Sequence, residues 1–313
     1  MLCFDKLKII TSIDYINDFN NKYFQSVYKN DILQYYKYQQ KQPYSLSIMV
    51  NYQHNELLIE FTSKVLKDNY KNLINKKTIQ ECFININNLN ICNLNIDMIL
   101  KDAEVCKCDV TKDITCNDIK GLKQCVKTNL VNYNKWVCKP YKNGFVLENI
   151  VATSRFKNRI TVYNKGKELK MADNQLFINS LSDKEDVLFY YNDKIRFEHN
   201  INTKSQIKQF LNIPNNQLGN VLNSEANPIL TVFNKALKEV PVTNTCAILS
   251  LKERLCELML EKCDFDLGKV EAEIRCFSSK NTSITKAMKP YKELHHRLQE
   301  NTISAIDIRN LVA

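Results

Sequence analysis

The sequence predicts an α+β fold, in which an antiparallel-rich sheet with packed helices spans residues 1–215 and a helical region spans residues 216–313. Two observations predict this fold class. Short β-rich runs bounded by polar turns recur through the first two-thirds of the chain. After Pro214, apolar residues instead recur at spacings of three and four, which is the period of an amphipathic helix. The change in period predicts two regions, divided after residue 215.

The elements of the first region follow from these patterns in chain order. Residues 44–62 form two β-rich runs around the polar segment Gln53-His54-Asn55, which predicts a hairpin. Asn117 is expected to cap the start of a helix. We expect further strands at 7–13, 103–114, 136–139, 145–151, 159–163 and 194–201, and helices at 76–89, 117–130 and 166–180.

The second region is expected to contain helices only. They are predicted at 217–237, 246–262, 266–276, 282–299 and 303–312. In the second of these, Leu251, Leu255, Leu258 and Met259 lie on one helical face. We expect this apolar stripe to be buried in a core.

The composition is that of a globular protein, with 44% hydrophobic and 25% charged residues. No stretch approaches the roughly 18 consecutive apolar residues of a transmembrane helix. The first ten residues place charges where a secretion signal would be apolar. The twelve cysteines include no C-x-x-C pair, and the four histidines complete no zinc pattern. We therefore expect a cytoplasmic protein with reduced thiols and no membrane partner.

The positive charge of the chain is concentrated in its first region. The formal net charge is +10, and residues 216–313 contribute only +1 of it, from 13 Lys and Arg against 12 Asp and Glu. Residues 1–215 carry the remaining +9. An excess of this size suits a polyanionic partner such as nucleic acid, and the 15 Tyr and 14 Phe offer rings on which unpaired bases stack.

One tyrosine lies within the densest cluster of this charge. Tyr163 ends an apolar run, Lys165 follows two residues later and Glu168 five residues later. The six basic residues of this segment are Arg155, Lys157, Arg159, Lys165, Lys167 and Lys170. A phenol beside cations and a carboxylate suits nucleophilic attack on a phosphodiester. The alternative is a strand edge with a solvated basic face.

Three carboxylates lie within otherwise apolar strands. Glu60, Asp109 and Glu198 each interrupt such a run, which is costly unless the side chain faces solvent, pairs with a cation or binds metal. Carboxylates that converge from neighbouring strands form a hard oxygen site for Mg²⁺ or Mn²⁺. The alternatives are an outward-facing position for each carboxylate and, for Arg196 beside Glu198, a cross-strand ion pair.

Four motifs in series resemble the filamentous-phage gene II replication initiators and, more loosely, rolling-circle plasmid initiators. The first is Ile-Glu followed by Lys-Val-Leu (residues 59–66), and the second is Asp109 to Thr111. The third is Ser-Arg, a basic stretch and Tyr-x-Lys-x-x-Glu (residues 154–168), and the fourth is Ile-Arg-Phe-Glu before a helix that ends near Pro214. The resemblance covers residues 1–215.

The resemblance implies a nuclease core that nicks and joins one DNA strand at a replication origin. Tyr163 would be the nucleophile that forms a 5′-phosphotyrosyl link, and Lys165 and Arg155 would neutralise charge on the phosphorane. The metal candidates are Glu60, Asp109 and Glu168, with Mg²⁺ or Mn²⁺ as cofactor. Further site candidates are Arg196 and Glu198, and the candidate DNA contacts are Lys157, Arg159, Lys167 and Lys170.

The implied partners are origin DNA, single-stranded or supercoiled duplex, and a host helicase or polymerase, in the cytoplasm of a bacterial host cell. The chain lacks the His-hydrophobic-His motif of many rolling-circle enzymes, and Tyr163 belongs to no Tyr-x-x-x-Tyr pair. The C-terminal helices are expected to bind DNA or a partner, or to complete the core. Two other functions stay open, namely non-catalytic sequence-specific DNA binding and a metal-dependent nuclease without a tyrosine nucleophile.

Overall fold

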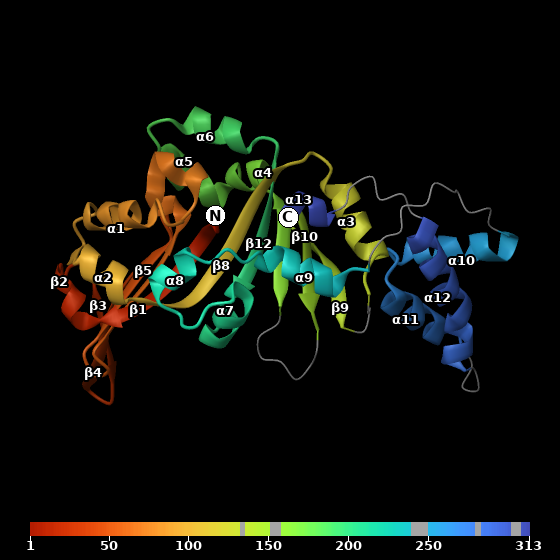
Figure 1. Ribbon diagram of the computed structural model, residues 1–313, viewed down its shortest axis with the longest axis horizontal. Helices are drawn as coiled ribbons and strands as arrows, with labels where there is room; N and C mark the ends of the chain where they lie inside the picture. Colours follow the sequence, from red (N-terminus) through yellow and green to blue (C-terminus); the bar gives the residue numbers. More distant parts are fainter. Residues whose placement is uncertain (132–134, 151–157, 239–249, 279–282, 302–307) are drawn as a thin grey trace. The chain divides into compact units, whose positions relative to one another are not determined.

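The computed structural model describes residues 1–131, 135–150, 158–238, 250–278, 283–301 and 308–313 (Figure 1). It confirms the α+β class. A ten-stranded sheet is combined with many helices, and the chain from residue 251 onwards is helical in its described parts.

The strand order in the large sheet is β3-β4-β5-β6-β1-β8-β12-β11-β10-β9. The pairs β3–β4, β4–β5, β5–β6, β6–β1, β1–β8, β8–β12 and β10–β9 are antiparallel. The strands are β1 (Phe4–Ser12), β3 (Gln25–Lys29), β4 (Ile32–Gln40), β5 (Leu46–Asn51), β6 (Glu56–Thr62), β8 (Glu104–Thr115), β9 (Trp136–Tyr141), β10 (Gly144–Asn149), β11 (Arg159–Asn164) and β12 (Lys194–Ile201). A second small sheet pairs β2 (Ile16–Phe19) with β7 (Cys92–Leu94).

The chain forms two compact units, each built from two segments. Unit 1 contains residues 1–117 and 163–229, and unit 2 contains residues 118–162 and 230–313. The chain leaves unit 1 after residue 117 and returns to it at residue 163. A single division of the sequence therefore does not separate the two compact units. The predicted functional division after residue 215 stays a prediction.

In unit 1, the alternation along β12 separates the side chains on the face of His199 from those that face the candidate site. Ile195, Phe197 and His199 are buried, and the ring of His199 lies 4.6 Å from that of Phe210 in α7 (Lys204–Leu211). Successive strand residues point to opposite faces. The opposite face of β12 therefore carries Arg196, Glu198 and Asn200.

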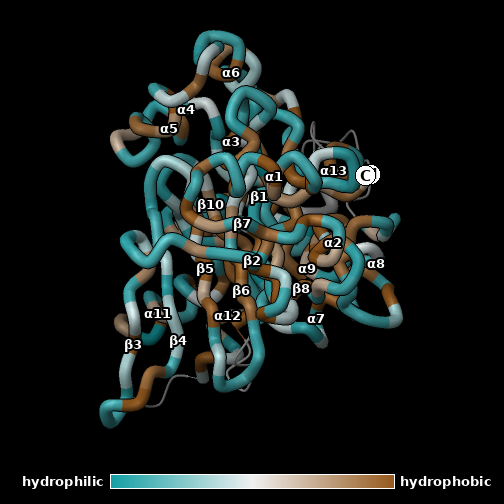
Figure 2. Tube along the Cα trace, turned by 90° about the vertical axis from the view of Figure 1, so that its left-hand side faces the viewer, coloured by the Kyte–Doolittle hydropathy of each residue, from teal (hydrophilic) through white to brown (hydrophobic). Residues whose placement is uncertain are grey.

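The helices of unit 1 lie at several places around its strands. They are η1 (Ile13–Tyr15), η2 (Ser63–Asn72), α1 (Ile79–Asn87), α2 (Ile96–Asp102), α4 (Lys165–Leu169), η3 (Ala172–Asn174), α5 (Gln175–Asn179), α6 (Lys184–Tyr191), α7 and α8 (Leu218–Leu222). Figure 1 shows α4, α5 and α6 gathered at one end of the unit 1 strands. Figure 2 shows β5 and β6 as more hydrophobic than β3 and β4, which are mostly hydrophilic to neutral.

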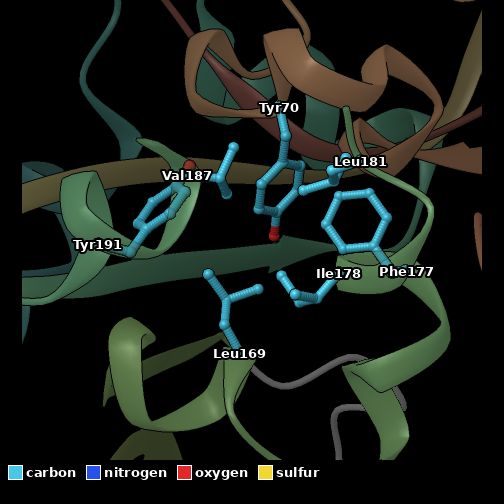
Figure 3. Packing of buried hydrophobic residues seen from close by; sticks show 7 residues of the cluster. All are labelled: Tyr70, Leu169, Phe177, Ile178, Leu181, Val187 and Tyr191. Atoms are coloured by element: carbon cyan, nitrogen blue, oxygen red, sulfur yellow. The ribbon is translucent and has the colours of Figure 1, made fainter. Parts of the chain in front are cut away.

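An aromatic cluster joins η2 to α4, α5 and α6. Figure 3 shows the ring of Tyr70 between the rings of Tyr191 and Phe177, with centroid separations of 5.5 and 4.9 Å. The other buried members are Leu169, Ile178, Leu181 and Val187. Burial of these rings and aliphatic side chains holds the short helices in place, because helices of this length are not stable by themselves.

Unit 2 combines strands with the C-terminal helices. Helix α3 (Ile119–Thr128) packs on β9 and β10, and α13 (Ile308–Val312) packs on α3. The other helices are α9 (Pro228–Ala236), α10 (Leu251–Lys262), α11 (Leu267–Phe277) and α12 (Ile284–Asn301). A cluster formed by α10, α11 and α12 buries Cys256, Leu260, Cys263, Leu267, Val270, Met288 and Leu294.

The predicted burial of the stripe on α10 is wrong for its three leucines, whereas Met259 packs against the cluster of α10, α11 and α12. Leu251, Leu255 and Leu258 are 82%, 60% and 49% exposed, whereas Cys256 and Leu260 are buried. The helix was predicted correctly, but it is rotated so that the face with Cys256 and Leu260 contacts α11 and α12. Helical periodicity identifies apolar faces without showing which one is covered.

Most predicted strands and helices of the described chain are confirmed, with three corrections. Asp118, and not Asn117, caps α3 by accepting a hydrogen bond from the amide of Gly121. The helix expected over 166–180 is broken into α4, η3 and α5, because the Asn174 amide binds the main-chain oxygen of Glu168. The helix expected over 217–237 is divided between α8 and α9, with Pro228 at the first position of α9.

No helix in the described part of the chain is both long and apolar enough to span a membrane. The eleven cysteines that the structure describes are free thiols.

Candidate active site around Tyr163

Tyr163 lies at the junction of β11 and α4. The strand residues Ile160 to Tyr163 are all buried, as expected for an inner strand of the sheet. Asn164 then caps α4, because its side chain accepts a hydrogen bond from the amide of Lys167 at 2.8 Å. The cap turns the chain immediately after Tyr163, so Lys165 begins the helix beside the tyrosine.

Gly166 allows α4 to approach α6 closely. A Cβ atom at this position would lie 2.5 Å from the main-chain oxygen of Tyr191. No other amino acid fits there without moving one of the two helices. The contact fixes the helix that carries Lys165 and Glu168.

The hydroxyl of Tyr163 donates a hydrogen bond to Oε1 of Glu198 at 2.5 Å. Glu198 lies on the same face of β12 as Arg196, and Tyr163 is only 7% exposed. The sequence motif named both residues but did not indicate that they contact each other. The structure therefore provides Tyr163 with a proton acceptor that lies within direct reach.

The protonation of this pair is strongly perturbed by burial. The pKa of Glu198 is raised to about 7, mainly by burial and secondly by the negative charge of Asp5. Burial and the neighbouring Glu198 raise the pKa of Tyr163 well above its usual value. Tyr163 is thus a neutral phenol at neutral pH, and Glu198 exchanges its proton in the physiological range.

Lys165 is 2% exposed and lies against two aromatic rings. Its Nζ lies 5.6 Å from the ring centroid of Tyr163 and 5.5 Å from that of Tyr70. It also forms an ion pair of 2.7 Å with Glu168, three residues later on α4. The predicted neighbours Tyr163, Lys165 and Glu168 are therefore brought together.

Asn174 links Glu168 to a second buried lysine. The Asn174 amide donates to Oε1 of Glu168 at 2.8 Å, and its oxygen accepts from Nζ of Lys64 at 2.6 Å. Burial alone would raise the pKa of Glu168, but Lys165, Asn174 and Lys64 together lower it below its ordinary value. Burial, together with the nearby Lys165, lowers the pKa of Lys64. Glu168 is therefore ionised and occupied by these partners.

Arg196 forms a cross-strand ion pair, which was the alternative to its interpretation as a site residue. Its Nε and Nη2 each donate to Asp113 at 2.7 Å, and its Nη1 donates to Asp5, also at 2.7 Å. The hydroxyls of Tyr191 and Tyr70 lie 3.1 and 3.4 Å away. The guanidinium is fully buried, and these partners compensate its charge.

Glu60 and Asp109 lie on the same sheet face as Glu198, but each has other partners. Glu60 forms ion pairs with Lys6 and Lys8. Asp109 is paired in register with Lys6 on one side and with Asn200 on the other. Burial raises the pKa of Asp109, and its Oδ1 has no hydrogen-bond partner in the described structure.

The predicted basic contacts lie in different environments. Arg155 and Lys157 are outside the described residues. Lys167 and Lys170 are exposed on α4 and directly after it, and Arg159 is half-buried at the start of β11. The two exposed lysines are accessible to a polyanion.

The carboxylates predicted to bind Mg²⁺ or Mn²⁺ do not form a common ligand set. Glu60 is bound by lysines of β1, whereas Glu168 is bound by Lys165 and Asn174. Within the described residues, no group of three or more His, Cys, Asp or Glu side chains could hold a metal ion. These carboxylates therefore offer no common ligand set for Mg²⁺ or Mn²⁺, and the cofactor stays a prediction.

Sequence reasoning did not identify several residues of this cluster. Asp5, Asn174, Tyr70 and Asp113 belong to no motif, although Lys64 lies in one. Asp5, at the start of a strand, could have been noticed as a further acid in an apolar run. The buried position of Asn174 depends on the break between α4 and α5, for which the sequence carried no signal.

Comparison with protein-family models, with curated proteins and with solved structures found no match. The resemblance to replication initiators therefore stays a prediction.

Proposed function

We propose that the protein is a DNA strand-nicking and strand-joining enzyme that initiates rolling-circle replication through Tyr163. The observation that carries this proposal is the 2.5 Å hydrogen bond from the Tyr163 hydroxyl to Glu198, a carboxyl group whose pKa is about 7. A general base works best when its pKa lies near the operating pH. Glu198 fits this requirement.

In the proposed reaction, the Tyr163 oxygen attacks the phosphorus of one DNA strand while Glu198 accepts the phenolic proton. A bond forms between the tyrosine oxygen and phosphorus, and the bond from phosphorus to the 3′-oxygen breaks. The leaving 3′-oxygen takes up a proton from water and becomes a free hydroxyl. In the return step a 3′-hydroxyl attacks the phosphotyrosine and loses its proton to water, the bond from phosphorus to the tyrosine oxygen breaks, and Glu198 returns its proton to Tyr163, which rejoins a strand.

The raised pKa of Tyr163 requires the proton to leave during the attack. A free phenolate would be disfavoured by the buried surroundings, so Glu198 must accept the proton as the new bond forms. Lys165, within 5.6 Å of the ring, supplies positive charge beside the developing phosphorane. A requirement for Mg²⁺ or Mn²⁺ stays a prediction, which adduct formation with EDTA or with added MgCl₂ tests.

The burial of Tyr163 favours a second candidate function. With 7% of its surface exposed, Tyr163 is accessible to a phosphate only after a local opening. In a non-catalytic DNA-binding protein no opening is needed, and the bond to Glu198 only stabilises the junction of β11 and β12.

Tyr163→Phe separates the two functions. Wild-type protein incubated with random-sequence single-stranded DNA should form an adduct that survives denaturant, and Tyr163→Phe should form none while binding DNA normally. Tyr28→Phe, at an exposed tyrosine on β3, is the matched control and should form the adduct. Adduct formation by Tyr163→Phe would contradict the assignment of the nucleophile, and its absence from wild-type protein would support the non-catalytic function.

A further inference from the structure

A basic pocket of about 260 Å³ lies on the strands β1, β4, β5 and β6 of unit 1. Its charged lining residues are Lys6, Lys8, Lys37, Lys41 and Glu60. Its other lining residues include Tyr35, Gln39, Ser47 and Met49. Four lysines and one carboxylate give the pocket a formal charge of +3, which suits an anionic ligand.

The negative charge within the pocket is already compensated. Lys6 and Lys8, both on β1, form ion pairs with Glu60. Burial would raise the pKa of Glu60, but the two lysines lower it below its ordinary value. Within the described residues, Lys37 and Lys41 form no ion pair with a carboxylate. The positive charge that remains for a ligand therefore lies mainly at these two side chains.

The strand register places the pocket on the same sheet face as Glu198. Glu198 and Asn200 alternate on one face of β12, and Asn200 is paired with Asp109 of β8. Asp109 is paired with Lys6 of β1, which lines the pocket. Residues paired directly across strands share a face. From β12 to β4, which carries Lys37, there are five strand spacings, or about 24 Å.

The lining favours a sugar-phosphate chain with unpaired bases over a double helix. Lysine ammonium groups bind phosphates as point charges. The half-exposed ring of Tyr35 offers a surface on which a base stacks. The volume of about 260 Å³ has room for one nucleotide unit, and Lys6 and Lys8 lie two residues apart along β1.

We propose that this lysine pocket binds single-stranded DNA several nucleotides away from the phosphate that Tyr163 attacks. The part of this proposal that concerns Tyr163 rests on the proposed function. DNA binding by the pocket can be measured without any cleavage. The bound strand runs from the pocket across β1 and β8 toward Glu198.

The test uses Lys37→Ala/Lys41→Ala in the Tyr163→Phe background, so that no cleavage disturbs binding. Fluorescence anisotropy with a labelled single-stranded oligonucleotide should show at least tenfold weaker binding. The slope of log affinity against log salt should fall in magnitude by about 1.4, since each single-strand phosphate contact contributes about 0.7. Lys76→Ala/Lys77→Ala, at two exposed lysines before α1, is the matched control and should bind as the parent.

Lys41→Gln alone repeats the test at an exposed position, should the double variant unfold. Unchanged affinity and salt slope would overturn the pocket proposal, whether or not the wild type forms an adduct. An equal loss of affinity for duplex DNA would overturn the single-strand assignment. Weaker single-strand binding without any wild-type adduct would support the pocket and refute the nicking function.

Discussion

Glu198→Gln is the sharpest test of the chemistry around Tyr163. Gln replaces the carboxylate with a group of the same shape, whose oxygen still accepts the hydrogen bond from Tyr163 but takes up no proton. A positioned general base contributes about 10²- to 10⁴-fold to a rate. We expect adduct formation to slow by about that factor while DNA affinity stays unchanged.

The pH dependence of adduct formation by the same variant is an independent test of Glu198 as the base. Because the pKa of Glu198 is about 7, wild-type Glu198 is protonated below that pH and cannot accept the phenolic proton. The wild-type rate should fall about tenfold for each pH unit below 7, whereas the Gln variant should lack this acidic limb. Single-turnover formation of the denaturant-resistant adduct between pH 5.5 and about 9 measures both.

Stability gives the control for this variant. The pKa of Glu198 is raised on folding from 4.5 to about 7, so its contribution disfavours the folded state as pH rises through that window. Gln removes this penalty and should stabilise the protein at pH 8 by up to about 3 kcal/mol.

A variant with the wild-type rate and the wild-type acidic limb would refute Glu198 as the base.

Three further substitutions test the surroundings of this pair. Lys165→Ala should slow adduct formation by about 10²-fold with little change in DNA affinity, and unchanged single-turnover kinetics would remove Lys165 from the site. Gly166→Ala should destabilise the protein by about 1–3 kcal/mol in urea unfolding, because its Cβ meets the Tyr191 oxygen; an unchanged midpoint would contradict the close approach. Arg196→Met should cost about 3–5 kcal/mol by leaving Asp113 uncompensated, and a variant as stable as wild type would contradict a structural ion pair.

The sequence predicted the contacts that depend on local spacing. Lys165 and Glu168 are three residues apart, and this separation places them side by side on a helix. The contact between Tyr163 and Glu198 depends instead on which strands are neighbours in the sheet. The 34 residues between them do not show that β11 and β12 are neighbours. Glu60 shows the same limit, because its pairing with Lys6 and Lys8 follows from the register of β6 and β1.

Burial was less predictable than secondary structure. The periodicity of α10 predicted a helix correctly, yet Leu251 is 82% exposed. A helix with two apolar faces does not show in its own sequence which face meets a neighbour. The break within the helix expected over 166–180 was not predicted either, because the contacts of Asn174 with Glu168 and Lys64 do not show in the local periodicity.

The central claim is that Tyr163 attacks DNA, and mapping a covalent adduct tests it most directly. Wild-type protein is incubated with random-sequence single-stranded DNA, the denaturant-resistant complex is digested with nuclease and protease, and the modified peptide is sequenced by mass spectrometry. The account predicts a nucleotide attached through phosphate to Tyr163. A nucleotide on another tyrosine, or no modified peptide from protein that binds DNA, would contradict it.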